Sequence, residues 1–345
     1  MMTERKFSCL LSICITSYNR VKELERCLKS IDSKHADKVE VVVSEDCSPM
    51  REKIRQVVAD YARQSPYHVV FNTNEHNLGY DRNLYQLASM ASGEYVMYLS
   101  DDDCLFQGKL DEVMECVCEQ KPPIVYSAFW FGSGGGKKEA RRKYDESHVI
   151  PSGEHSAGKR VYDAILFSGL IFKRNLILET DPSRFVNSNW FQVYLFLNVI
   201  CQYGGYYQNT LLINCVSDGE NAFGKVASSD GHNELLADRE SVFSKLEFQK
   251  GLMKVIRMFD ADHHTHVFNL FSKEYSLRSF TGLYIARKEG LASCREFWKR
   301  MRSLNIRLYP ICYVYYFCLM VFGAKFSKLL LSLPKRLLIK VRKYY

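Results

Sequence analysis

The last part of the chain has no acidic side chain. From Phe297 to Tyr345 every charged residue is a lysine or an arginine, and eleven such residues occur there, while the whole chain has a net charge of +8. The residues before Phe297 therefore carry a net charge of −3. A nucleic-acid-binding groove needs a basic surface on the folded body of the protein, so we expect no nucleic-acid partner.

A disulfide framework is also lacking. The twelve cysteines are scattered, and the closest pair, Cys116 and Cys118, falls in a predicted helix. A chain of 345 residues that is 47% hydrophobic buries a large core without covalent staples. We therefore expect reduced thiols and a reducing compartment.

Two common motifs are missing as well. No small-residue cleavage site follows the apolar stretch of residues 7–15, so we interpret this stretch as a strand and not as a signal peptide. The glycine-rich run at residues 132–136 has neither the spacing of a dinucleotide site nor the Lys-Ser/Thr pair of a phosphate loop. It predicts a mobile loop that would serve as a substrate lid.

What the chain does have is an alternation of apolar runs and helical patterns. The predicted strands are residues 9–16, 39–44, 68–72 and 95–99, and the predicted helices are residues 22–31, 54–61 and 81–91. Strands that are apolar on both faces and alternate with helices predict an α/β fold, a Rossmann-like and mainly parallel sheet with flanking helices. A helical C-terminal region follows.

Three polar clusters, residues 17–20, 45–48 and 100–103, follow predicted strands, where ligands bind in open α/β sheets. The third contains Asp101, Asp102 and Asp103, whose carboxylates would repel one another in a sheltered crevice. Carboxylate oxygens suit Mg²⁺ or Mn²⁺, which bind one or two carboxylates together with substrate phosphates. The alternative is an acidic cap on the helix predicted to start near Leu110.

Four segments, in this order and spacing, resemble glycosyltransferase family 2. They are residues 12–20 (SICITSYNR), 43–48 (VSEDCS), 77–79 (NLG) with Arg82 and Asn83, and 93–103 (GEYVMYLSDDD). The resemblance covers residues 8–115, and residues 168–172 (SGLIF) resemble the segment before the acceptor site. It implies a GT-A fold, and within the family the chain is similar to bacterial enzymes of surface-polysaccharide assembly, including the abequosyltransferase-like group.

The resemblance also implies roles for single residues. The turn at Thr16, Tyr18 and Asn19 would contact the nucleotide, and Asp46 would bind its base or ribose. The segment that would shape the nucleotide pocket comprises Asn77, Gly79, Arg82 and Asn83. Asp101 and Asp102 would reach the ribose and the donor sugar. Asp103 is the favoured metal ligand, with Asp102 as the alternative, Asp101 as a second candidate ligand and His232 as an additional one.

One departure concerns the general base. Inverting members place a carboxylate where this chain has residues 189–192 (NWFQ). Nearby candidates for the base are Asp181, Asp218 and Glu220, of which we favour Asp181. Asp181-Pro182 would equally open a turn, and Asp218-Gly219 would equally mark a hairpin.

The predicted organisation has three parts. Residues 1–230 form the GT-A domain, with a nucleotide-binding half at 8–115 and an acceptor half at 116–230. Residues 231–304 form a helical region, and residues 305–345 form a membrane-associating tail. The uncharged stretch 308–324 is at the short limit for a bilayer span.

Basic residues alternate with leucines after that stretch, which predicts attachment to an anionic membrane surface. Pro310 argues against a span, and a core helix with a solvated basic end is the alternative.

The function predicted from these features is an inverting, metal-dependent transfer from a nucleoside-diphosphate sugar to a lipid-linked or other saccharide acceptor. It would belong to bacterial surface polysaccharide or O-antigen biosynthesis, in the cytoplasm and peripheral to the inner face of the cell membrane. One rival is a sugar nucleotidyltransferase, but its glycine-rich signature is missing before Gly79. Another is a non-catalytic, membrane-bound protein that binds sugar nucleotides.

Overall fold

The computed structural model describes residues 9–131, 139–141, 144–185, 188–216 and 242–342. The chain divides into two compact units, Met1–Val226 and Ala227–Tyr345.

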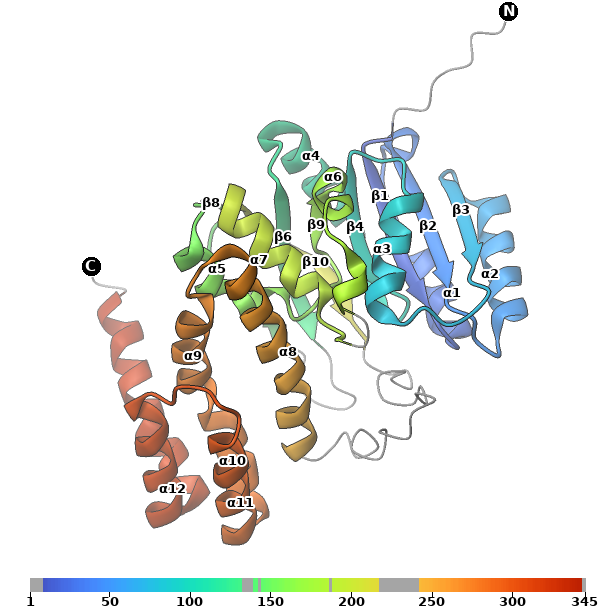
Figure 1. The fold of residues 1–345 in the computed structure, drawn as a ribbon. Helices are drawn as coiled ribbons and strands as arrows, with labels where there is room; N and C mark the ends of the chain where they lie inside the picture. Colours follow the sequence, from blue (N-terminus) through green and yellow to red (C-terminus); the bar gives the residue numbers. More distant parts are fainter. Residues whose placement is uncertain (1–8, 132–138, 142–143, 186–187, 217–241, 343–345) are drawn as a thin grey trace, which may run out of the picture. The chain divides into compact units, whose positions relative to one another are not determined.

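The first part of the sheet is parallel. Its strands lie in the order β3-β2-β1-β4 (Figure 1). The strands are β1 (Leu11–Ser17), β2 (Val39–Glu45), β3 (His68–Thr73) and β4 (Tyr95–Ser100), and between them come α1 (Val21–Lys29), the short 3₁₀ helix η1 (Ala36–Lys38), α2 (Arg51–Gln64) and α3 (Tyr80–Met90). The predicted alternation of strands and helices is confirmed.

Alternate side chains of these strands face opposite layers of helices. Ile13 and Ile15 of β1 are fully buried in one core cluster with Leu28 of α1 and Ile54 of α2. On the other face, Cys14 Sγ lies 3.7 Å from the carbonyl oxygen of Leu87 in α3. Because strand side chains alternate between faces, a strand covered on both sides is apolar at most positions.

The second part of the sheet is mixed. It continues in the order β4-β9-β6-β10-β5, with β9 antiparallel to both of its neighbours and β10 parallel to β6. Strands β5 and β8 pair antiparallel with β10, and β7 pairs antiparallel with β6. The elements are β5 (Asp103–Leu105), α4 (Lys109–Gln120), β6 (Ile124–Phe131), β7 (Glu139–Arg141), β8 (His148–Ile150), α5 (Glu154–Arg160), η2 (Val161–Ala164), β9 (Ile171–Lys173), α6 (Arg174–Leu178), η3 (Pro182–Phe185), α7 (Phe191–Tyr203) and β10 (Gly205–Cys215).

The acidic triplet does not cap a helix. Helix α4 has Gly108 as its N-cap residue, and Asp103 lies in β5. The alternative reading of the triplet as a helix cap is therefore wrong. The twelve cysteines are free thiols, as expected.

The second unit is helical. It contains α8 (Val242–His263), α9 (Val267–Arg278), α10 (Phe280–Glu289), α11 (Leu291–Arg302) and α12 (Pro310–Arg342). Helix α10 packs against α11 and α12, and α12 also packs against α9. Among the described residues, the one helix long and apolar enough to cross a membrane is α12, over Pro310–Leu330.

Pro310 begins this helix. A proline is tolerated in the first turn of a helix because the amide there has no intrahelical acceptor. Pro310 therefore gives no argument against a span, and that part of the expectation was wrong.

Candidate functional site

Strands β1, β2 and β4 end at the same edge of the sheet. Thr16 stands opposite Ser44 of β2 on one side and opposite Ser100 of β4 on the other. The three polar clusters that follow these strands therefore come together at one edge, as expected from their positions after parallel strands.

A buried ion pair joins the first cluster to the third. Arg20 Nη1 lies 2.8 Å from Asp101 Oδ1 and 3.0 Å from Asp102 Oδ2, and Arg20 is only 8% exposed. The backbone amide of Tyr18 donates to Asp101 Oδ2 at 3.2 Å. Asn19 has a φ of 61°, a left-handed conformation that asparagine adopts more readily than most residues. This conformation makes the tight turn that aims Tyr18 and Arg20 at the triplet.

Asp103 is held from a segment far along the chain. Ser168 Oγ donates to Asp103 Oδ2 at 2.5 Å and accepts the backbone amide of Ser100 at 3.1 Å. Ser100 Oγ in turn donates to Asp102 Oδ1 at 2.5 Å. Ser168 therefore fixes the Asp103 carboxylate relative to the end of β4.

The triplet is electrostatically strained at neutral pH. Burial raises the pKa of Asp101 to about 7, although the Arg20 charge opposes this rise. Burial also raises the pKa of Asp103 to about 7, and the Asp102 charge adds to the effect. A charged carboxylate out of water is costly unless a cation or strong donors compensate. A cation placed at Asp103 would favour its ionised form.

The donor set fits Mg²⁺ or Mn²⁺ with an incomplete protein shell. Asp101 and Asp102 are paired with Arg20, whereas Asp103 receives hydrogen bonds from the neutral groups of Ser168 and Cys215. Within the described ranges, no group of three or more His, Cys, Asp or Glu side chains is placed to hold a metal. Mg²⁺ commonly uses one or two carboxylates and takes its remaining ligands from phosphates and water.

Asp46 organises the segment that follows β3. Its Oδ1 accepts the amide of Leu78 at 2.7 Å and Asn74 Nδ2 at 2.9 Å, and its Oδ2 accepts the amide of Gly79 at 3.0 Å. Asn77 Oδ1 also accepts the Gly79 amide, at 2.9 Å. Asp46 therefore fixes the backbone of residues 77–79 beside the second polar cluster.

The other residues expected in the nucleotide pocket differ in burial. Asn83 is buried, and its side chain bridges Asn74 and the carbonyl oxygen of Ser44. Thr16 is half-buried, while Asn19 and Arg82 are exposed. Because Asn83 lies behind the end of β2, its contacts help to position that strand end.

A carboxylate from α3 contacts the backbone of the segment 189–192, which has no carboxylate of its own. Asp81 is buried, and it accepts the backbone amides of residues 188–191 at 2.9 to 3.0 Å, together with Ser188 Oγ at 3.1 Å. These amides belong to the turn before α7, to its N-cap residue Trp190 and to its first residue, Phe191, and the amides at a helix start have no acceptor within the helix. Asp81 therefore caps α7 across more than a hundred residues of sequence, and these hydrogen bonds hold its carboxylate in place.

The candidate bases are not brought to the triplet by any described contact. Asp181 is exposed, its Oδ1 and Oδ2 accept the amide and hydroxyl of Ser183, and these hydrogen bonds lower its pKa. This is the geometry of a turn cap, the alternative considered for Asp181-Pro182. Asp218, Glu220 and His232 lie outside the described residues, as does most of the glycine-rich loop.

Sequence reasoning did not assign roles to Arg20, Ser168 and Asp81. Arg20 lies inside the matched segment 12–20, so its position beside the first strand was a usable signal. Ser168 bonds to a residue 65 positions away in the sequence, and Asp81 bonds to residues more than 100 positions away. No rule of sequence spacing predicts contacts of this kind.

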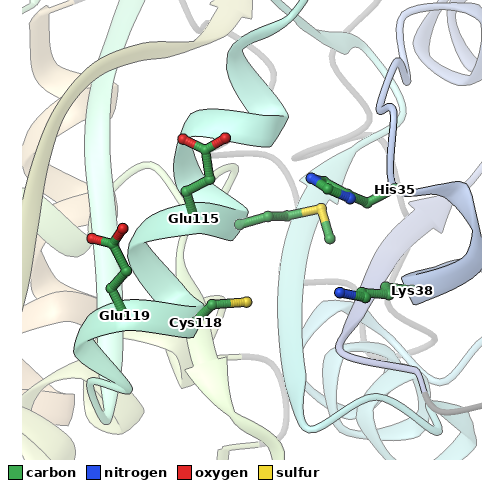
Figure 2. A pocket seen from close by; sticks show the side chains of 6 residues that line it. His35, Lys38, Glu115, Cys118 and Glu119 are labelled. Atoms are coloured by element: carbon green, nitrogen blue, oxygen red, sulfur yellow. The ribbon is translucent and has the colours of Figure 1, made fainter.

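A pocket of about 210 Å³ lies elsewhere (Figure 2). Glu115, Cys118 and Glu119 of α4 line one side of it, opposite His35 and Lys38, which precede β2. The amino ends of the parallel strands are at this edge, so the pocket is opposite the acidic triplet. We therefore do not assign it to the candidate site.

Comparisons with known sequences identify relatives over part of the chain. An uncharacterized glycosyltransferase of Haemophilus influenzae is 32% identical over 117 residues, which are 34% of this chain and 37% of that protein. Abequosyltransferase RfbV of Salmonella typhimurium is 27% identical over 101 residues, 29% of this chain and 30% of the relative. A GalNAc(5)-diNAcBac-PP-undecaprenol beta-1,3-glucosyltransferase of Campylobacter jejuni is 30% identical over 170 residues, 48% and 52% of the two chains.

The match thus spans about half or less of each of these relatives. Among solved structures, S. aureus TarS 1-349 in complex with UDP-GlcNAc superposes with a TM-score of 0.58 at 13% identity, covering 86% of this chain and 80% of that one. This likeness confirms the predicted fold class, a GT-A-like sheet followed by a helical region. Residues 12–177 match the family described as Glycosyl transferase family 2, and this part of the chain belongs to that family.

Proposed function

We propose that this protein transfers a sugar from a nucleoside-diphosphate sugar to a hydroxyl group of a saccharide acceptor, with inversion at the anomeric carbon. The observation that carries the proposal is the convergence of three strand ends, where Arg20 pairs with Asp101 and Asp102 and Ser168 holds Asp103. Family membership and the likeness to a UDP-GlcNAc complex of TarS support the donor class.

Each group at this edge has a task in the proposed reaction. The turn at Thr16, Tyr18 and Asn19 contacts the nucleotide, together with the 77–79 backbone that Asp46 orients. Asp103, with Asp101 as a second candidate ligand, would hold Mg²⁺ or Mn²⁺. Such an ion, when bound, would stabilise the charge on the departing diphosphate. Arg20 pairs with Asp101 and Asp102, and its charge opposes the rise that burial causes in the pKa of Asp101, since a nearby cation favours the charged form.

The acceptor is proposed to be lipid-linked, within bacterial glycan biosynthesis. The Campylobacter jejuni relative has an undecaprenol-linked saccharide in its name. The basic, apolar C-terminal segment would hold the enzyme at the cytoplasmic face of the membrane, where such an acceptor is presented.

Release of free nucleoside diphosphate tests the proposal. A panel of nucleotide sugars is incubated with the protein, a saccharide acceptor and Mn²⁺ or Mg²⁺. For the donor that turns over, Asp103→Asn should lower kcat/KM by about 100-fold or more, because it removes a charged ligand. The matched control is Asp37→Asn, at an exposed aspartate of η1 at the opposite edge.

Other outcomes would replace the proposal. Stabilisation by a nucleotide sugar without diphosphate release with any acceptor would indicate the non-catalytic binder. Pyrophosphate release from a nucleoside triphosphate would indicate the nucleotidyltransferase. Retention of full metal-dependent turnover by Asp103→Asn would refute the metal assignment.

The base is tested in the same assay with Asp181→Asn, Asp218→Asn and Glu220→Gln. Loss of the base removes a contribution of about 10²- to 10⁴-fold to the rate, with little effect on donor binding. We expect one variant to show this loss, and the exposed turn-cap geometry of Asp181 makes the comparison with the other two necessary.

A further inference from the structure

The exposed side of α12 is apolar over several turns. Its exposed apolar residues are between 39% and 61% accessible, and they are Tyr313, Val314, Phe317, Val321, Phe322, Phe326, Leu329 and Leu330. Tyr313, Val314, Phe317 and Val321 recur at spacings of three and four residues, so they form a stripe along the part of the helix before Gly323. The opposite side, with Cys312, Leu319 and Ser327, is buried in the second unit. The stripe, defined as Tyr313, Val314, Phe317 and Val321, is an exposed apolar surface, although the Tyr313 ring also contacts Trp298.

Helix α12 is broken in the middle. Gly323 has φ 74° and ψ 174°, which is not a helical conformation. The first limb, residues 310–322, is therefore about 20 Å long at 1.5 Å per residue, whereas the hydrocarbon core of a bilayer is about 30 Å thick. Neither this limb alone nor a straight continuation through Gly323 provides a span.

Side chains of the second unit donate hydrogen bonds to backbone carbonyl groups near the break. Arg287 Nε of α10 donates to the carbonyl oxygen of Leu319 at 2.9 Å, and Ser327 Oγ donates to the carbonyl oxygen of Cys318 at 2.7 Å. A span centred on this break would bring the Arg287 guanidinium to the bilayer midplane, where a charged side chain is expensive. At the membrane surface, the same guanidinium stays near water and lipid head groups.

Charge selects the partner. Lys325 and Lys328, which follow the stripe in the chain, are exposed, and every charged residue from Phe297 onwards is basic. A second copy of the chain would place these like charges against each other in a symmetric interface. An anionic lipid surface offers both an apolar interior for the stripe and negative head groups for the lysines.

We propose that α12 lies flat in the interface of an anionic bilayer, with the stripe inserted among the acyl chains, and does not cross the membrane. This proposal specifies how the proposed transferase would contact the membrane. It rests on the proposed function only for the purpose that this contact would serve. The binding itself requires neither donor nor turnover.

Vesicle binding tests the partner. The full-length chain is floated with vesicles of phosphatidylcholine alone or of phosphatidylcholine with 30% phosphatidylglycerol. Binding should occur to the anionic vesicles, and Phe317→Glu in the stripe should weaken it by roughly tenfold or more. The matched control is Val149→Glu, which changes an exposed valine of β8 in the first unit and should bind like the parent chain. Equal melting temperatures show that both variants fold.

Topology tests the flat orientation. The full chain is expressed in bacteria with either green fluorescent protein or alkaline phosphatase fused after Tyr345. Fluorescence without phosphatase activity is expected, since both ends of α12 stay on the cytoplasmic side. Phosphatase activity would mean that α12 crosses the membrane and would overturn the proposal.

The proposal would also be overturned if the chain did not bind anionic vesicles. The same holds if the chain formed a dimer in solution that Phe317→Glu converted to a monomer. Vesicle binding by a chain that releases no nucleoside diphosphate would reject the transferase function and leave this proposal standing.

Discussion

At the scale of single residues, the candidate site depends on how one carboxylate is aimed. Ser168 donates to Asp103 and accepts from the Ser100 amide, so it connects the expected metal ligand to the end of β4. Asp103 needs this support because its pKa is raised by burial. A hydroxyl donor stabilises the ionised form that a divalent cation requires.

Removing the Ser168 hydroxyl should therefore weaken metal binding. We expect Ser168→Ala to lower the affinity for Mn²⁺ by about tenfold, the effect of losing a hydrogen bond to a charged group. The affinity is measured from the Mn²⁺ dependence of the melting temperature and of turnover. Ser89→Ala is the control, since the exposed Ser89 hydroxyl donates to the carbonyl oxygen of Gln86. An unchanged affinity in Ser168→Ala would show that the hydroxyl does not support the ion.

At the scale of elements, the start of α7 depends on a side chain from α3. Asp81 satisfies the backbone amides of residues 188–191, and few acceptors could replace it because Asp81 is only 2% exposed.

Truncating this side chain should destabilise the first unit. We expect Asp81→Ala to lower the free energy of unfolding by about 3 kcal/mol, because several buried donors lose their acceptor at once. Urea denaturation measures the change. Asp60→Ala, which removes an exposed carboxylate paired with Arg63, should cost less than about 1 kcal/mol. Equal effects of the two substitutions would contradict the capping role.

The elements differ in how far the sequence predicts them. The strands β1 to β4 were predictable because each is a run of apolar residues ended by a polar cluster. Strand β9 has three residues and enters the sheet antiparallel between β4 and β6, so it has no periodicity to detect.

The same limit applies within the site. The triplet was predictable from adjacent residues, whereas the contacts of Ser168 and Asp81 arise only when distant segments meet. A break such as that at Gly323 was equally hidden, since a glycine inside a helical pattern is usually tolerated.

At the scale of the whole molecule, the triplet links metal binding to pH. The folded pKa of Asp101 and of Asp103 is about 7, above the ordinary value of 3.8. Between these values the folded chain holds protons that the unfolded chain has lost. The stability contributed by these groups is therefore fully present below about pH 4 and is lost as the pH rises towards about 7.

Metal binding should follow the opposite trend. Because the ion displaces the proton from Asp103, its apparent affinity should fall by about tenfold for each pH unit below about 7. Titrations of Mn²⁺ at pH 6, 7 and 8, followed by the melting temperature, measure this. Asp103→Asn should weaken Mn²⁺ binding at each pH and reduce its pH dependence to the part that Asp101 contributes, and equal affinities of the parent chain at pH 6 and pH 8 would contradict the assignment.

The position of β9 has a consequence for how the chain is made. Strands β1 to β4 complete one part of the sheet as the first hundred residues leave the ribosome, but the free edge of β4 has to wait for β9, and β6 has to wait for β10. During synthesis the two strand edges are thus unpaired and open to wrong partners. Pausing translation before residue 171 should prolong that vulnerable interval, whereas pausing after residue 215 should not.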